Sequence, residues 1–500
     1  MGIFVRSLAT ARLHGVYALE RKPPSTITAQ GTGVVAIVAA LPWGPSQQVT
    51  SPASVGAALA MFAPRGMAHA GTSYMTLISK GWPELRIVRV VSATAVTASS
   101  ILSSVTPTAI CTIAAKYAGT EGNNLTGVVA VASDGNALHF NLTVSITGAS
   151  GTTTEVLQNI NLSGTGTDTT FDFTTSVLIG SITKTASGRP VDATYAFTLG
   201  TSPALISSDY IGTSQAPDKG LSLLEGDKTI RHVCTDDVGT SLRPAVNAGV
   251  LAHVELCGDR IGYINGPSGQ TAALARTDAA LYQSFQVVYV DSWVYQLDDI
   301  DGTEHLMPGA PWAASVAAQT SPSTSIAWKD QEMGVMLSGI TRLEFDRGIG
   351  AATNTDNGVV TFVRGVNGGL RFEADPNTAA PTDASRGDLR RTRMAIHLAT
   401  SFTRSLGSNV DAPNVPLNQD DIVIAWDGFL NGLVLARDKD PNHTPHLMAY
   451  SIAPTSASNP TDGIQAGEFI VATDAQTSAS MAKIGLSLSI GTTVRVKVTS

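Results

Sequence analysis

The nine histidines of this sequence are the side chains best suited to acid–base chemistry near neutral pH. A serine hydrolase needs a nucleophile, a base and an orienting group within reach of one another, and its nucleophile often lies in a Gly-x-Ser-x-Gly turn. That motif does not occur in the sequence. We therefore assign no catalytic residue, and we interpret the histidines as ordinary surface or core residues.

Three short segments match ligand-binding motifs only in part. Gly226–Thr229 resembles the end of a phosphate-binding loop but lacks the upstream glycine, so we predict a turn before a strand. His443 and His446 could hold a metal ion, but no third ligand lies nearby in the sequence, and we predict a polar loop. Asp298–Gly302 resembles part of a calcium loop without its final glutamate, which favours a β-turn. The sequence thus predicts no metal site and no cofactor.

The composition is that of a folded multidomain protein, with 500 residues, 43% hydrophobic and 14% charged. This length suggests roughly two to four domains. Typical soluble proteins have about 25% charged residues, so much of this surface must be uncharged, which favours packing against copies of the same chain. The net charge of −8 argues against nucleic acid as a partner, because nucleic-acid-binding surfaces are basic.

The cysteines and the N-terminal segment bear on location. Cys111, Cys234 and Cys257 are odd in number and widely spaced, so we expect no disulfide framework and a reducing compartment during assembly. The N-terminus has basic residues but no continuous apolar segment typical of a signal peptide. The apolar run Val34–Leu41 is far shorter than the roughly 20 residues that cross a bilayer. We therefore expect a soluble chain with no direct membrane insertion.

The N-terminal part predicts an extended arm over residues 1–30 and the beginning of an α/β body over residues 31–96. The arm lacks a long periodic segment and contains a Pro-Pro pair. Gly33–Ala40 is a continuous apolar run that ends at a Pro-Trp-Gly-Pro turn, which predicts a buried strand, with a short buried helix as the alternative. Ser54–Phe62 has helical spacing, and Leu85–Val91 predicts a second buried strand.

The composition changes over residues 97–213, where Ser, Thr, Gly and Val dominate and no arginine occurs between Arg89 and Arg189. Several short segments alternate apolar and polar residues, and Gly-rich turns separate them: Thr126–Ala132, Leu138–Ile146 and Ala193–Leu199. This pattern is typical of an antiparallel β-sandwich with one solvated face. We predict an inserted, peripheral β-sandwich domain.

Residues 214–380 predict alternating strands and helices, as expected of a parallel sheet with helices on its faces. The expected strands are Thr229–Val233, Ile261–Asn265 and Gln286–Val290. The expected helices are Pro244–Leu256, Gln270–Phe285 and Trp312–Ala318.

Residues 381–490 predict an α+β C-terminal domain, and residues 491–500 a terminal arm strand. Asp388–Leu406 gives the clearest helical signal, because apolar residues recur there at every fourth position from Met394 onward. A second helix is expected over Asp420–Leu435. The expected strands are Glu468–Ala472, Ile484–Ile490 and Thr493–Val498.

The order and spacing of these segments resemble the contractile phage tail sheath protein family across nearly the whole chain. The segments that carry the resemblance are His14–Tyr17 with Glu20, Gly33–Pro45, the Gly-x-x-Gly-Asn sequence within Tyr117–Leu125, Tyr289–Trp293, and Trp312–Ala318. The resemblance implies a subtilisin-like α/β domain without protease activity, an inserted β-sandwich, an α+β C-terminal domain and extended terminal arms.

The resemblance also implies a structural role rather than an enzymatic one. A sheath subunit polymerises as stacked hexameric rings around an inner tail tube, and the sheath contracts to drive the tube through the host envelope. The expected partners are copies of the chain, the tail tube protein, and baseplate and tail terminator proteins. The expected location is the virion tail, after assembly in the host cytoplasm.

In this family the terminal arms add strands to sheets of neighbouring subunits, which is β-augmentation. The alternating valines of the C-terminal segment would form one apolar face of such a strand. The residues that we assign to the two arm strands are Val16, Tyr17, Val494, Val496 and Val498. The alternative is that these residues belong to edge strands of the subunit's own sheet.

A basic cluster lies near the start of the predicted Asp388–Leu406 helix and is unusual in an acidic chain. It consists of Arg386, Arg390, Arg391 and Arg393. We hypothesise that this cluster faces acidic residues of the tube. The alternatives are a solvated helix end and ion pairs within the sheath.

Two other classes of protein compete with this interpretation. A secreted β-rich hydrolase or adhesin with a subtilisin-like domain would have an export signal and a motif around its nucleophile, and neither is visible here. The sheath of a related contractile injection system, of the bacteriocin or secretion type, would differ in setting rather than in mechanism. The sequence does not separate that sheath from one in a virion.

Overall fold

The computed structural model describes residues 3–5, 17–19, 33–64, 84–106, 108–148, 151–162, 173–214, 216–297, 302–327, 340–348, 350–364, 369–383, 387–406, 416–439, 447–453, 470–477, 485–489 and 495–499. The chain divides into two compact units. The first is Gly31–Arg393, and the second combines Met1–Gln30 with Met394–Ser500. The finer domain boundaries expected from the sequence stay predictions.

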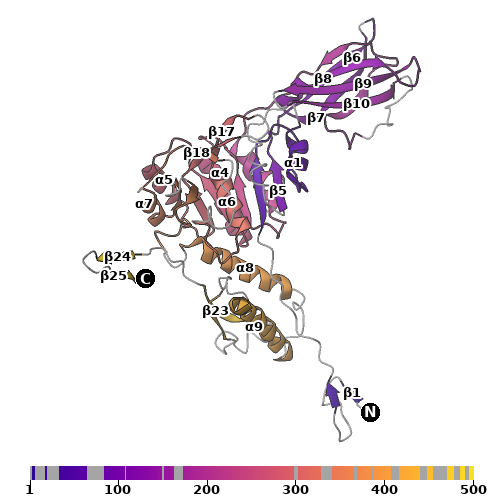
Figure 1. Ribbon diagram of the computed structural model, residues 1–500. Coiled ribbons are helices and arrows are strands. Elements are labelled where there is room, and N and C mark those ends of the chain that lie inside the picture. The colour runs from indigo at the N-terminus through magenta and orange to yellow at the C-terminus, as the bar shows by residue number, and fades with distance from the viewer. Residues whose placement is uncertain are drawn as a thin grey trace. The chain divides into compact units, whose positions relative to one another are not determined.

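A seven-stranded, mainly parallel sheet forms the centre of the first unit (Figure 1), with the order β19-β15-β14-β13-β3-β5-β4. Its strands are β3 (Val34–Ala39), β4 (Val49–Thr50), β5 (Glu84–Arg89), β13 (His232–Thr235), β14 (Ile261–Asn265), β15 (Val287–Val290) and β19 (Val359–Val360). β4 pairs antiparallel with β5, and the other pairs are parallel. All of β3 is buried, as expected of a central strand with both faces covered. The structure confirms the predicted parallel sheet.

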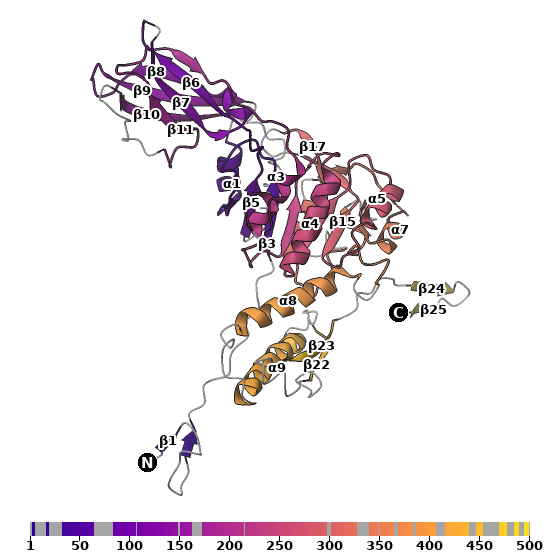
Figure 2. The ribbon, with the colours of Figure 1, turned by 180° about the vertical axis from the view of Figure 1, so that it is seen from behind.

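Helices cover both faces of this sheet (Figures 1 and 2). The apolar side chains of α4 (Arg243–Cys257) share a core with Val34, Ala36 and Val38 of β3. Helix α6 (Ala310–Gln319) contacts β3, β13 and β14 and is buried along nearly its whole length. The other helices of the unit with defined bounds are α1 (Val55–Phe62), α3 (Ser207–Ile211), α5 (Ala272–Ala279) and α7 (Gly350–Asp356).

The predicted strand at Thr229–Val233 begins later, at His232. The main-chain N–H of Thr229 donates to Oδ1 of Asp227 over 2.8 Å, and the Thr229 hydroxyl donates to the same oxygen over 2.5 Å. These bonds close the turn that the sequence predicted at Gly226–Thr229, so the ladder of the sheet starts only after it.

The predicted helix over Gln270–Phe285 is shorter than expected, because α5 covers Ala272–Ala279. Its start is fixed by Thr271, whose hydroxyl accepts the N–H of Leu274 over 3.3 Å. Beyond Ala279 the backbone forms three-residue turn bonds, such as Leu281 N–H to Asp278 O at 3.0 Å. Helical spacing in the sequence therefore extended past the real end of the helix.

The region predicted to be a β-sandwich contains two antiparallel sheets, ordered β10-β9-β8-β12 and β11-β7-β6. The strands are β6 (Thr97–Ser103), β7 (Ala109–Ala118), β8 (Thr126–Val131), β9 (His139–Gly148), β10 (Gly151–Asn161), β11 (Ile179–Lys184) and β12 (Thr194–Ala196). Buried and half-buried residues alternate along β9, and Phe140 and Leu142 of this strand share one core with Ile113 of β7. The structure confirms a β-sandwich, which alternation in the sequence had indicated.

Two smaller sheets complete the first unit. One has the order β17-β16-β18, with β16 (Trp293–Leu297), β17 (Glu304–Pro308) and β18 (Ile340–Leu343). The other pairs β20 (Phe362–Arg364) with β21 (Leu370–Phe372). The β-turn predicted at Asp298–Gly302 falls between β16 and β17 and lies almost wholly outside the described residues.

The second unit contains most of α8 (Leu389–Leu406), together with α9 (Pro416–Lys439), β22 (Ala449–Ala453) and β23 (Ala472–Gln476). Met394 of α8 belongs to a core with Trp426 and Leu430 of α9, and Leu398 and Phe402 pack against that core. The apolar stripe predicted for α8 therefore packs as expected. α9 is longer than predicted, and it starts with Pro416, a residue favoured at the first helical position.

Candidate functional site: terminal strands and the sandwich junction

The carboxyl edge of the parallel sheet is where α/β folds usually bind ligands. Here its polar side chains bond to other parts of the same chain. Asn265, at the end of β14, donates to the carbonyl oxygen of Val290 over 2.7 Å and accepts the N–H of Ala310 over 2.5 Å. Asp291, after β15, accepts two N–H groups of Arg347 over 2.8 and 3.1 Å. These side chains fix strand ends and the start of α6.

Asp236 lies at the same edge, directly after β13, and its residue is 6% exposed. Burial raises the pKa of this carboxyl to about 7, although the N–H of Ala40, which donates to Oδ2 over 2.7 Å, opposes the rise. A pKa near 7 suits acid–base catalysis, but here the carboxyl holds the end of β3 next to the end of β13. Asp236 is therefore a structural group at the meeting point of two central strands.

The described residues include no group of three or more His, Cys, Asp or Glu side chains that could hold a metal ion. The described histidines lie in five separate elements: His139, His232, His253, His305 and His397. The predicted polar loop at His443 and His446 lies outside the described residues. All three cysteines are free. No described helix has both the length and the apolar character needed to cross a membrane.

The C-terminal segment forms an antiparallel pair, β24 (Gly485–Ser489) with β25 (Arg495–Thr499). Val496 pairs with Leu488, and Val498 pairs with Leu486. Directly opposed residues share a face of a sheet, so these four positions lie on one face. Among the described strands, none adds to either edge of this pair. Val494 lies outside the described residues.

The N-terminal segment forms a parallel pair, β1 (Ile3–Val5) with β2 (Tyr17–Leu19), and Tyr17 pairs with Ile3. No other described strand joins this pair. Val16 lies outside the described residues. An isolated two-stranded sheet is at best marginally stable in water. Both ends of the chain therefore form small sheets that would be stabilised by further strands.

The second unit has a third pair of this kind, in which β22 runs antiparallel to β23. Unlike the terminal pairs, this one rests on a packed core. Trp426 of α9 donates its ring N–H to the hydroxyl of Thr473 in β23 over 2.8 Å, and the Tyr450 hydroxyl in β22 donates to Asp427 over 2.8 Å. A two-stranded sheet anchored to a helix has the stability to accept a strand along a free edge.

Two members of the predicted arginine cluster are used inside the first unit. Arg393 is 4% exposed and donates to the main-chain oxygens of Ala317, Thr320 and Thr324, which tie α8 to the end of α6. Arg390 is also 4% exposed and pairs with Asp388 over 3.1 Å.

The other two members of the cluster differ from these. Arg391 is exposed, with its Nε 4.0 Å from Asp388. Arg386 lies outside the described residues. Contact between the cluster and a tube stays a prediction. Arg391 is the described member that is exposed and could make such a contact.

Trp43 joins the β-sandwich to the α/β body. It lies in the loop after β3, yet its side chain is fully buried in the core of the sandwich. The indole N–H donates to the carbonyl oxygen of Val177 over 3.2 Å, and the ring meets Tyr117 edge-on at a centroid distance of 5.3 Å. Gly44 follows with φ +105°, and a Cβ there would lie 2.4 Å from the ring of Phe62, so only glycine fits this turn.

Arg89, the last residue of β5, forms the second link. Its guanidinium is 2% exposed and donates to four carbonyl oxygens, which are those of Leu41, Pro42, Gly44 and Ala118. Three of these belong to the loop after β3, and the fourth ends β7 of the sandwich. Burial lowers the pKa of Arg89 to about 10, so the group keeps its charge at neutral pH.

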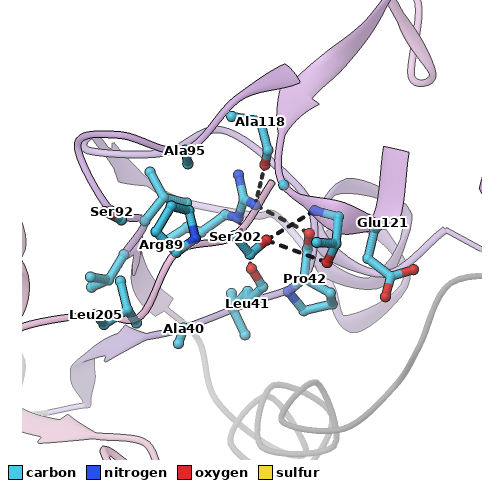
Figure 3. Close-up of a pocket in the computed structure, with 15 residues that line it drawn as sticks. Ala40, Leu41, Pro42, Arg89, Ser92, Ala95, Ala118, Glu121, Ser202 and Leu205 are labelled. Atoms are coloured by element: carbon cyan, nitrogen blue, oxygen red, sulfur yellow. Dashed lines mark hydrogen bonds between the residues drawn. The ribbon is translucent and has the colours of Figure 1, made fainter. Parts of the chain in front are cut away.

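A cavity of about 170 Å³ adjoins this guanidinium (Figure 3). Its wall combines the loop after β3, the connection from β5 to β6, the start of the segment after β7, and residues 202–205. Figure 3 shows the Arg89 side chain among the lining residues, with hydrogen bonds to Ala118 and Pro42, and the Glu121 carboxylate directed away from it. The links and the cavity lie at the same junction.

No protein-family model matches the sequence, and no curated protein matches it. Solved structures are similar in fold over most of the chain. The sheath tail protein from Desulfitobacterium hafniense is 16% identical with a TM-score of 0.60, over 88% of this chain and 93% of that chain. The sheath tail protein from Listeria innocua is 15% identical with a TM-score of 0.59, over 90% and 96%. The contracted helical sheath of the anti-feeding prophage is 13% identical with a TM-score of 0.54, over 94% and 97%.

The chain has the fold of a contractile tail sheath protein. The likeness covers between 88% and 94% of the chain in these three cases. The resemblance found in the order and spacing of sequence segments is thereby confirmed for the fold.

Sequence reasoning did not assign a role to Trp43 or Arg89 of this sheath fold. Trp43 lies in a Pro-Trp-Gly-Pro turn, and Arg89 is one of two arginines in the otherwise apolar strand predicted at Leu85–Val91. An arginine at the end of a buried strand needs acceptors there, which is the signal that could have identified Arg89. The acceptors themselves lie up to 48 residues away and were not predictable from local patterns.

Proposed function

We propose that this chain is the structural subunit of a contractile sheath. Subunits assemble as stacked hexameric rings around an inner tube, and contraction drives the tube through a host envelope. The observation that carries this proposal is the sheath fold over 88% of the chain, together with terminal strand pairs that no other described strand completes.

Strand exchange through the terminal arms supplies the links between subunits. A strand from one subunit adds to a free sheet edge of another, and main-chain hydrogen bonds give the affinity. In this chain the donors are the segments around Tyr17 and Val496, and the anchored β22–β23 pair is the acceptor. The alternative is that both terminal pairs are edge strands of their own subunit. It predicts that these strands stay packed on the same subunit in the monomer.

Contraction is a change between two packings of one folded subunit, and no catalytic step is needed. The free energy comes from differences in the surface buried between subunits, so the sheath needs no nucleotide site. The α/β sheet, with subtilisin-like topology, then acts as a rigid support without protease activity. The bonds of Asn265, Asp236 and Asp291 within the chain support this structural role.

The partners of the sheath are copies of the chain, the tail tube protein, and baseplate and tail terminator proteins. Arg391 is the proposed contact to acidic residues of the tube, because it is the exposed described member of the arginine cluster. Arg391→Glu should reduce assembly on tubes but not assembly of the sheath alone. Arg342→Glu, at an exposed arginine elsewhere in the first unit, is the matched control. Equal tube-dependent assembly in both variants would reject the contact.

Two settings suit this function, a phage tail and a related contractile injection system. The first is the virion tail, after assembly in the host cytoplasm. The second is supported by the likeness to the anti-feeding prophage sheath. A secreted hydrolase or adhesin is less well supported, because no observation in the structure favours it over the sheath fold.

Negative-stain electron microscopy of the purified full-length chain tests the proposal. Concentrated protein, without partners and at varied salt, should form hollow tubes or stacked rings of uniform diameter. A monodisperse monomer under all conditions, checked by light scattering on the same samples, would contradict self-assembly.

A further inference from the structure

The guanidinium of Arg89 is a buried cation without a charged partner among the described residues. Its acceptors among the described residues are main-chain carbonyl oxygens, and no described carboxylate forms an ion pair with it. Carbonyl dipoles offset part of the cost of burying a charge, but an opposite charge would offset more. The site is electrostatically suited to an anion.

The guanidinium also has one donor to spare. Arginine has five N–H groups, and four hydrogen bonds are made to the described residues. Nε donates to Leu41, Nη2 to Pro42 and Ala118, and Nη1 to Gly44, which leaves one N–H on Nη1 without a described acceptor. Arg89 borders the cavity, so an anion bound there is within reach of its charge.

The cavity has room for a small organic anion. Its volume of about 170 Å³ is roughly tenfold the space that one water molecule needs. Apolar side chains such as Leu41, Val90 and Leu205 line much of the wall. Ser92 and Ser202 also line it, and their hydroxyl groups contact Thr94 and Thr120. Glu121 lines the cavity too, with its carboxylate directed away from Arg89 (Figure 3). A mixed wall of this kind suits a carboxylate with a short hydrocarbon part better than a strongly hydrated ion.

We propose that this junction cavity binds a small carboxylate anion, whose charge neutralises Arg89 and whose apolar part contacts the cavity wall. The bound anion ties together the loop after β3, the end of β5 and the end of β7, because Arg89 already donates to the first and last of these. Binding therefore stiffens the joint between the α/β body and the sandwich. This inference is independent of the sheath function.

Saturation-transfer NMR with sodium acetate as the probe tests the proposal on the full-length chain at constant ionic strength. The wild type should transfer magnetisation to the acetate methyl group. Ala95→Leu fills the cavity from its wall without altering an Arg89 bond, and it should reduce the transfer at least about fivefold. Ala93→Leu is the matched control, because Ala93 is exposed on the same turn and does not line the cavity.

Thermal unfolding provides a second readout. About 100 mM acetate should raise the wild-type Tm by about 2 °C relative to a sulfonate too large for the cavity, and the shift should vanish in Ala95→Leu. If that variant does not fold, Leu205→Phe fills the cavity from another segment and serves instead. No transfer to acetate in the wild type, or equal transfer in the folded cavity-filling variant, would overturn the proposal.

Discussion

The sandwich junction and the terminal strand pairs use hydrogen-bonding groups in opposite ways. At the junction, one guanidinium donates to four main-chain oxygens and Trp43 is fully buried in the core of the sandwich. At the termini, β1–β2 and β24–β25 are two-stranded, and no further described strand completes them. At the junction, Arg89 makes four hydrogen bonds within the chain, whereas the terminal pairs have edges that no other described strand occupies.

This difference separates what is fixed within a subunit from what is open to neighbours. A sandwich held only by flexible linkers would be an independent module, but its core contains Trp43 from the loop after β3. We expect the sandwich and the α/β body to respond to mutation as one cooperative block. Mutations in the terminal strand pairs should change the assembly of subunits rather than the folding of one subunit.

Trp43→Ala should have the largest effect on folding. It removes a fully buried aromatic side chain, its contact with Tyr117 and its bond to Val177 O, so the free energy of unfolding should fall by about 3–5 kcal/mol. Chemical denaturation of the full-length chain measures this. Val156→Ala, on an exposed position of the sandwich, should cost less than about 0.5 kcal/mol. A similarly small cost at Trp43 would mean that the sandwich is independent of the loop.

Arg89→Met should cost less, about 2 kcal/mol, because it leaves four carbonyl oxygens without their donor but also removes a buried charge. The same denaturation experiment measures it, and Arg342→Met at an exposed site is the control. Additivity with Trp43→Ala is informative, since both residues act on the same loop. A double variant that costs less than the sum would support one joint, whereas strict additivity would separate the two links.

The fold was more predictable than the junction. Ile261–Asn265 was predicted as a strand with the bounds that β14 has, and Asp388–Leu406 as a helix within one residue of α8. Both signals are local, an apolar run and a four-residue period. The bond from Trp43 to Val177 joins residues 134 positions apart, and no pattern within a segment encodes such a pairing.

The basic cluster near the start of α8 shows the same limit over a few residues. The sequence placed its four arginines together as one surface, whereas the structure buries Arg390 and Arg393 and exposes Arg391. Charge alone does not decide burial when main-chain acceptors are in reach, and the acceptors of Arg393 come from the end of α6 and the loop after it. The sequence shows that the arginines are clustered, but it does not show which of them are buried and which are exposed.

Asp236→Asn should change the pH dependence of stability next to the junction. Burial raises the pKa of Asp236 from 3.8 to about 7, and Tyr210, Asp237 and Arg243 lie near it. Between these values the folded chain holds a proton that the unfolded chain has released, so this group makes the free energy of unfolding fall as pH rises from about 4 to 7.

Thermal unfolding from pH 4 to 8 checks this prediction. The asparagine keeps an acceptor for the Ala40 N–H but does not titrate. The stability of the variant relative to wild type should therefore be about 2–3 kcal/mol greater at pH 8 than at pH 5. Asp346→Asn, at an exposed loop position, should leave the wild-type profile unchanged. A difference that is constant across the pH range would show that Asp236 is ionised in the folded chain.

Val496→Asp should have the smallest effect on folding and a large effect on assembly. The position lies in a two-stranded pair that no other described strand completes, so the free energy of unfolding should change by less than about 0.5 kcal/mol. In the assembly, this strand is proposed to add to a sheet of a neighbouring subunit. A carboxylate on the face shared with Leu488 would then be buried in the interface between subunits, so tubes should be lost in electron micrographs. Thr499→Asp makes the same charge change on the other face of β25 and should preserve tubes. If Val496→Asp lowers the free energy of unfolding by more than about 1 kcal/mol, β25 packs within its own subunit, and the edge-strand alternative is favoured.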